Sequence, residues 1–220
     1  MHRLSDDLSY CHVDGHPLFL DIGKDRYFRL SPPLEQTFNA YLEGSVLPAA
    51  DTDRLEAHGV LVAGPASARP VSGPIAPARH SALELPGQHT ACSPCDIAEL
   101  FAIVCRTRLE LRVRHLKRIL EDRVSYRSRV AMPCDLPADT QVLAAAHTFL
   151  AARTFVPIRT CCLLDALSMS TFLSRRRLYA RLVFGVVGDP FSAHCWVQRG
   201  DVALNDTVGN ATAYTIIRVV

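Results

Sequence analysis

The sequence lacks any long hydrophobic run, although 49% of its 220 residues are hydrophobic. A membrane-spanning helix needs about 18 consecutive apolar residues, and no apolar stretch of the sequence approaches that length. Residues 1–7 contain no apolar core of the kind that a secretory signal requires. We therefore expect a cytoplasmic protein with no membrane partner.

The sequence also lacks a charge excess and an ordered cysteine pattern. Its 24 Lys and Arg residues nearly balance 22 Asp and Glu residues, giving a net charge of +2, which argues against an obligate nucleic-acid partner. The eight cysteines have no disulfide-framework spacing, so we expect free thiols in a reducing compartment. Cys92 and Cys95 form a single Cys-x-x-Cys pair without a second pair of ligands, so no metal is expected.

The last third of the chain contains a Cys, a His and an Asp in an order that suits a papain-like nucleophile, base and orienting acid. Residues 160–175 contain no Gly or Pro and are apolar nearly all round, which predicts a buried helix beginning near Thr160. A cysteine in the first turn of a helix has a lowered pKa and reacts as the thiolate. An inert core cysteine is the alternative. Periodicity does not choose between the adjacent Cys161 and Cys162.

Three strands are predicted after this helix, at residues 179–187, 193–198 and 202–206. A three-residue loop centred on Gly200 would join the last two, so that cross-strand partners have residue numbers summing to 400. This register places His194 opposite Asp206 on one face of the hairpin. A carboxylate there would hold the imidazole in one tautomer. A structural histidine at the edge of the core is the alternative for His194 alone.

Residues 1–65 are expected to form a first, smaller domain. Strands are predicted at residues 8–13, 17–21 and 26–30. Ser31 before Pro32 indicates a helix start, and a second short helix opens at Asp51 or Thr52. A small sheet followed by helices is a winged-helix-like arrangement. A DNA-binding or purely structural module is the alternative, although the second helix carries little basic charge for reading a DNA groove.

The remaining segments complete the predicted organisation. Residues 66–89 are expected to be a linker, because the stretch at 64–79 is rich in Pro, Ala, Ser and Gly. Such a tether would raise the effective concentration of a captured peptide at the second domain. Ser93 and Asp96 resemble a capping box at the start of a helix that runs to about Glu121, and Asp139 opens another helix. The second domain spans residues 90–220, and the fold class is α+β.

Four stretches of the second domain carry a resemblance to a known family. They are residues 162–167 (CLLDAL), 181–186 (RLVFGV), 189–197 (DPFSAHCWV) and 204–206 (LND). Together they resemble the transglutaminase-like leader peptidases of lasso peptide biosynthesis, the B proteins. The resemblance implies that Cys162 is the nucleophile, His194 the base and Asp206 the third member of a catalytic triad.

The first domain resembles the PqqD-like recognition element that captures leader peptides in ribosomal peptide biosynthesis. The Asp-Gly hairpin, the Leu-Asp strand and the aromatic third strand carry this second resemblance. It implies that the leader adds as an extra strand beside the third strand and packs against the last helix. The leader-binding residues would then be Arg26, Tyr27, Phe28, Arg29, Leu30 and Leu55.

The two resemblances together imply a fused B protein, in which a winged-helix-like (PqqD-like) domain precedes a papain/transglutaminase-like cysteine peptidase domain. The protein would bind the leader of a lasso precursor peptide, cleave it from the core peptide, and pass the core to an asparagine-synthetase-like cyclase. A transglutaminase-like acyltransferase and a non-catalytic leader-binding chaperone are the alternatives. The sequence has no Gly-rich phosphate loop, so no cofactor is expected and any ATP dependence would act through the partner cyclase.

Overall fold

The computed structural model describes residues 2–65, 75–85, 92–130 and 139–220, and it is a mixed α+β structure. Its N-terminal part contains strands β1 (His2–Leu4), β2 (Leu8–Val13), β3 (His16–Asp21), β4 (Arg26–Arg29) and β5 (Leu61–Ala63), and helices α1 (Pro32–Leu42) and α2 (Ala49–Ala57). Strands β2, β3 and β4 form an antiparallel meander, while β1 and β5 pair separately. The three strands predicted here are confirmed.

Local sequence signals explain these elements. Asp14 and Gly15 join β2 to β3 with φ values of 55° and 82°, the pair of positive values that a type I′ hairpin turn requires. Helix α1 begins at Pro32 after Ser31, as predicted, and α2 begins at Ala49, slightly before the predicted start. A buried cluster joins the two helices to one face of the meander; it comprises Leu8, Phe19, Leu30, Leu34, Phe38, Leu55, Val60 and Leu61.

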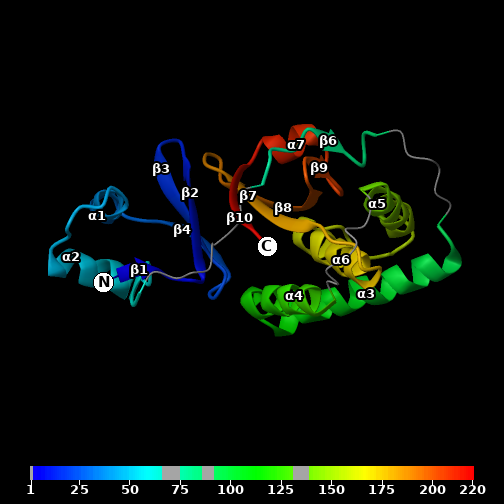
Figure 1. Ribbon diagram of the computed structural model, residues 1–220, viewed down its shortest axis with the longest axis horizontal. Helices are drawn as coiled ribbons and strands as arrows, with labels where there is room; N and C mark the ends of the chain where they lie inside the picture. Colours follow the sequence, from blue (N-terminus) through cyan, green and yellow to red (C-terminus); the bar gives the residue numbers. More distant parts are fainter. Residues whose placement is uncertain (1, 66–74, 86–91, 131–138) are drawn as a thin grey trace.

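The C-terminal part contains β6 (His80–Ser81), α3 (Pro94–Val113), α4 (Leu116–Val130), α5 (Asp139–Arg153), α6 (Cys162–Arg175), β7 (Arg181–Val187), β8 (Ser192–Arg199), β9 (Val202–Ala203), α7 (Val208–Thr212) and β10 (Thr215–Val219). The five strands form one sheet in the order β10-β7-β8-β9-β6. Helix α6 packs on this sheet, and α3 and α5 pack against α6 (Figure 1). The predicted helix at residues 160–175 is thus the central helix of this part.

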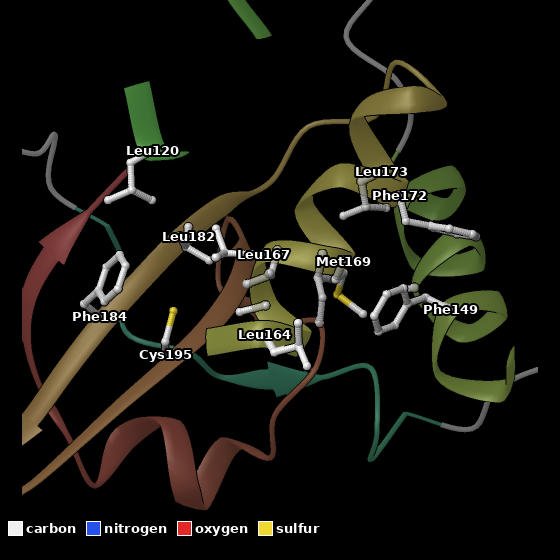
Figure 2. Close-up of a cluster of buried hydrophobic side chains, with 14 of the residues drawn as sticks. Leu120, Phe149, Leu164, Leu167, Met169, Phe172, Leu173, Leu182, Phe184 and Cys195 are labelled. Atoms are coloured by element: carbon white, nitrogen blue, oxygen red, sulfur yellow. The ribbon is translucent and has the colours of Figure 1, made fainter. Parts of the chain in front are cut away.

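Apolar side chains from α6 and the sheet point toward one another and form the main core (Figure 2). Leu167 of α6 lies beside Leu182 of β7, and the sheet also contributes Phe184 and Cys195 to this cluster. All four are buried, and each belongs to the same hydrophobic cluster. This packing fixes the first turn of α6 against strand β8, which is where the candidate nucleophile and base lie.

The single helix predicted from Ser93 to about Glu121 is two helices. The capping box is present, because Ser93 accepts from the backbone N–H of Asp96 while the Asp96 carboxylate accepts from Ser93. Helix α3 ends where Arg114 takes an extended conformation (φ −134°, ψ 145°). The backbone N–H of Leu116, at the start of α4, donates to the carboxylate of Asp25 at 3.1 Å. A partner from the N-terminal part therefore stabilises the break, which local sequence could not reveal.

Part of the predicted linker belongs to the C-terminal sheet. Strand β6 pairs in parallel with β9, and Ala78, Ser81 and Ala82 are buried. The hydroxyl of Ser81 donates to the backbone carbonyl of Asp206 at 2.5 Å. The described end of this segment therefore supports the candidate site directly, and the predicted linker residues 66–74 and 86–89 lie outside the described part of the chain.

The N-terminal meander packs directly on the C-terminal part. Val13, Leu18, Leu20 and Ile22 belong to the same buried cluster as the residues of α6. Strand β3 is consequently buried on both faces, with Phe19 on the side of α1 and its neighbours on the side of α6. Strand β10 also lies beside β2. An apolar interface, and not a tether alone, joins the two parts. Within the described ranges, no helix is both long and apolar enough to cross a membrane.

Candidate active site

Cys162 is the first residue of α6, and Cys161 is the N-cap. The Cys162 thiol is half-buried and hydrogen-bonded to His194. This hydrogen bond, with the backbone N–H groups of Leu163 and Cys195 that donate to the sulfur, lowers the pKa of Cys162 below its usual value of 9.0 even though burial opposes the shift. The site therefore favours the thiolate.

The structure separates the two adjacent cysteines that periodicity could not. Cys161 is exposed, and its side chain makes no capping hydrogen bond. Cys162 points to the opposite strand, where His194 lies. The nucleophile expected from the family resemblance is thus the cysteine that meets the histidine.

His194 on β8 lies between the thiol and Asp206. Its Nε2 is 2.7 Å from Oδ2 of Asp206, and both side chains are largely buried. The hydrogen bonds to Asp206 and to Cys162 raise the pKa of His194 to about 9. Nε2 donates to the carboxylate, which leaves Nδ1 to face the sulfur. The predicted Cys, His and Asp are therefore adjacent, as a nucleophile, base and orienting acid would be.

Asn210 is a part of this arrangement that sequence reasoning missed. Its Nδ2 donates to both carboxylate oxygens of Asp206, at 2.9 and 3.1 Å. Burial raises the pKa of Asp206, but the hydrogen bonds from His194 and Asn210 outweigh it, and the net shift is downward. Nδ2 of Asn210 also lies 3.1 Å from Nε2 of His194. Both nitrogens carry hydrogen, so neither accepts from the other, and Asn210 acts on the carboxylate of Asp206. A side chain on α7, which was not predicted, had no sequence signal for this role.

The hairpin register predicted from the sequence is wrong by one residue. Arg199 pairs with Val202, so partner numbers sum to 401 and the loop has two residues, Gly200 and Asp201. Gly200 has a φ of 58°, which suits the first central position of a type II′ turn. The predicted third strand is also shorter, because β9 ends at Ala203.

A break after β9 restores the predicted contact. In a continued ladder Asp206 would lie opposite Cys195, on the face away from His194. Instead, Oδ1 of Asn205 accepts the backbone N–H of Val197 at 2.7 Å and takes the place of a main-chain acceptor. The chain bends there, and the Asp206 carboxylate reaches the imidazole.

Aromatic rings hold the imidazole in place. The His194 ring stacks on Trp196 at 5.9 Å and lies 5.1 Å from the ring of Tyr214. Gly185 pairs with His194 on the neighbouring strand. A Cβ atom at Gly185 would lie 2.6 Å from Cβ of Tyr214 and 2.9 Å from the ring of Trp196, so these two residues can approach the strand only because this position has no side chain.

An ion pair fixes the chain that leads into α6. The guanidinium of Arg153 donates to Asp165 in the first turn of α6 at 2.7 Å. It also donates to the backbone carbonyls of Val156 and Ile158, at 3.2 and 2.9 Å. Arg153 is buried. The loop before Cys161 is therefore bound to the helix that carries the candidate nucleophile.

The residues expected to bind a leader lie on or beside β4, which is an edge strand of the described meander. Arg26 and Arg29 are exposed, and Tyr27 and Phe28 are half-buried. Leu30 is buried and Leu55 has no exposed surface. Both leucines are thus core residues in this state, and Leu55 has no surface available to a peptide. Among the described residues, no cluster of three or more His, Cys, Asp or Glu side chains could hold a metal ion.

Comparison with known proteins supports the assignment of the C-terminal part. No curated protein and no solved structure matches the chain. A family model described as the transglutaminase-like superfamily matches residues 102–219, more than half of the chain, and that range contains Cys162, His194 and Asp206. The chain belongs to the transglutaminase-like superfamily.

Proposed function

We propose that this protein is a cysteine peptidase that removes the leader of a lasso precursor peptide. The observation that carries the proposal is the hydrogen-bonded row of Cys162, His194 and Asp206 within a transglutaminase-like domain. The family resemblance of the surrounding motifs supports the choice of a leader peptide as the substrate.

The geometry supports a two-step acyl transfer. The Cys162 thiolate attacks the carbonyl carbon of the last leader residue, and the His194 imidazolium gives its proton to the departing amine of the core peptide. Neutral His194 then takes a proton from water, which attacks the thioester and releases the leader as a carboxylate. Asp206 holds the ring orientation and stabilises the imidazolium in the first step.

The edge of β4 that has no neighbouring strand in the described part of the chain is the proposed site for the leader. An added strand there would gain main-chain hydrogen bonds, and its alternate side chains would give selectivity. The proximity of this edge to the C-terminal domain supports the proposal, because the ring of Tyr27 on β4 lies 5.5 Å from that of Phe191, next to β8. The freed core peptide would pass to an asparagine-synthetase-like cyclase, through which any ATP dependence would act.

Incubation with the precursor peptide encoded beside the gene tests the proposal. Mass spectrometry should detect a leader with a free terminal carboxylate and an intact core. Cys162→Ala should abolish cleavage, whereas the matched variant Cys161→Ala should retain a measurable rate. An uncleaved precursor, or cleavage by Cys162→Ala, would show that the proposed function is wrong. A leader joined to an added amine would instead identify an acyltransferase.

A further inference from the structure

Tyr27 of the N-terminal meander faces the C-terminal domain. Side chains alternate along a strand, and Phe28 stacks on Phe19 at 5.1 Å on the side of α1. Tyr27 pairs with Leu20, which belongs to the core shared with α6 and Cys195. The Tyr27 ring packs against that same core. The aromatic side chain therefore extends from β4 toward the candidate site.

The hairpin between β7 and β8 holds Tyr27 in this position. The ring of Phe191 lies 5.5 Å from that of Tyr27. Gly188 allows a close approach, because a Cβ atom there would lie 2.0 Å from Asp14 and 3.1 Å from the guanidinium of Arg29. Phe191 itself is 53% exposed, so this contact lies at the border of an open surface. The same short hairpin leads into the strand that carries His194.

The Tyr27 ring packs against the buried cluster that contains Cys195, the neighbour of His194, and Leu164 in the first turn of α6, and its hydroxyl has no hydrogen-bond partner among the described residues. Burial raises the pKa of Tyr27 well above its usual value, and the nearby thiols of Cys195 and Cys162 raise it further. The phenol is therefore a permanent donor. In the described part of the chain the Tyr27 hydroxyl makes no hydrogen bond. The Cys162 sulfur is already hydrogen-bonded to His194 and to two backbone N–H groups. A partly buried donor at the interface between β4 and the core of α6 is available for an acceptor on the substrate.

We propose that the Tyr27 hydroxyl donates a hydrogen bond to the carbonyl oxygen of the acyl group that Cys162 attacks. As the sulfur–carbon bond forms, the π electrons of the carbonyl move onto the oxygen, and the phenol stabilises that negative charge. When the oxyanion collapses, the carbon–nitrogen bond breaks and the amine takes the proton of His194. The backbone N–H of Cys162, in the first turn of α6 where amides lack helical acceptors, is the second donor. The N-terminal meander thus supplies a catalytic residue.

This inference rests on the proposed acyl transfer at Cys162, but its test does not require a leader peptide. The variant Tyr27→Phe keeps the ring, its contact with Phe191 and the backbone N–H of β4, and it removes only the hydroxyl. Tyr10→Phe is the matched control, because Tyr10 lies on β2 with its ring on Phe19 and Phe38, on the face away from the site. Acetylation of Cys162 by p-nitrophenyl acetate, followed by intact mass, passes through an oxyanion. Alkylation by iodoacetamide does not.

In the full-length protein, Tyr27→Phe should slow acetylation by about 10²-fold, the usual loss for one oxyanion donor, and leave alkylation within about twofold of wild type. Tyr10→Phe should change neither rate. Unchanged acetylation in Tyr27→Phe would overturn the proposal. An equal fall in the acetylation and alkylation rates would also overturn it, because the phenol would then act on the thiolate. An equal effect of Tyr10→Phe would overturn it as well, because the effect would then be structural. A wild-type protein that is not acetylated at Cys162 would also overturn it.

The failures of the two proposals are distinguishable. If Tyr27→Phe slows acetylation but wild-type protein leaves the precursor peptide intact, the role of Tyr27 stands and the leader peptidase function is wrong. If the precursor is cleaved equally fast by wild type and Tyr27→Phe, the function stands and the role of Tyr27 is wrong.

Discussion

At the scale of single residues, Cys162 and His194 share one proton. The pKa of Cys162 is lowered and that of His194 is raised to about 9. The pair of thiolate and imidazolium therefore exists at pH values between these two pKa values. Turnover should fall as the pH rises above about 9, because His194 then loses the proton that it gives to the leaving amine, whereas alkylation of Cys162 should not fall. Rates of both reactions from pH 5 to 10 check this, and a parallel fall in alkylation would contradict it.

The shift in the pKa of His194 also makes the stability of the fold depend on pH. The raised pKa of His194 means that its charged form stabilises the fold fully below the unfolded value of about 6.5, and this contribution is lost as the pH rises through about 9. Asp206 behaves oppositely, since its lowered pKa makes a contribution that is lost in acid. In His194→Ala, the difference in stability from wild type should therefore narrow at alkaline pH.

Asn210 is a positioning residue whose effect should differ from that of Asp206. Asp206→Asn should lower turnover by orders of magnitude, because the imidazole loses its orienting charge. Asn210→Ala removes two hydrogen bonds from the carboxylate, each worth about 1.5 kcal/mol to a charged group. It should lower turnover about tenfold and move the alkaline limb of the pH profile. An Asn210→Ala variant that loses turnover with an unmoved limb would argue for a structural role only.

At the scale of elements, the ion pair between α5 and α6 should be worth more than a surface pair. Arg153 and Asp165 have side-chain exposures of 8% and 16%, so removal of one partner leaves a buried charge. Arg153→Leu should lower the free energy of unfolding by about 3 kcal/mol and loosen the loop before Cys161. The double variant with Asp165→Leu should recover much of that loss. Urea unfolding of both variants decides this, and an equal loss in each would refute the buried-charge argument.

The hairpin of β8 and β9 shows what the sequence could and could not predict. Gly200 identified the turn, but a turn with Gly at its centre is compatible with loops of two or three residues. A difference of one residue in the loop shifts the register and moves every side chain of the strand to the other face of the sheet. The contact between His194 and Asp206 was predicted although the register was wrong, because the side chain of Asn205 breaks the ladder. A side chain that takes the place of a main-chain acceptor leaves no periodic pattern in the sequence, whereas the helix that begins at Cys162 has one.

At the scale of the whole molecule, the placement of the meander on the C-terminal domain was not predicted, although a signal existed. Residues 17–20 of β3 form a continuous apolar run, and such runs are typical of strands buried on both faces. The composition of the linker suggested a flexible tether instead. Leu18 and Leu20 in the core with α6 show that the two parts share packing, which is a long-range property that local patterns do not report.

This shared packing predicts that the covalent link between the two parts is dispensable. Fragments 1–70 and 71–220, produced together, should elute as one complex from a sizing column and retain turnover within about tenfold of the intact chain, because the buried apolar face favours association by about 25 cal/mol for each Å². Leu20→Asp in the short fragment should separate them, since it places an unpaired charge in the shared core, while the exposed Val46→Asp should not. Independent elution of the unmodified fragments would instead mean that the tether holds the meander at the active site.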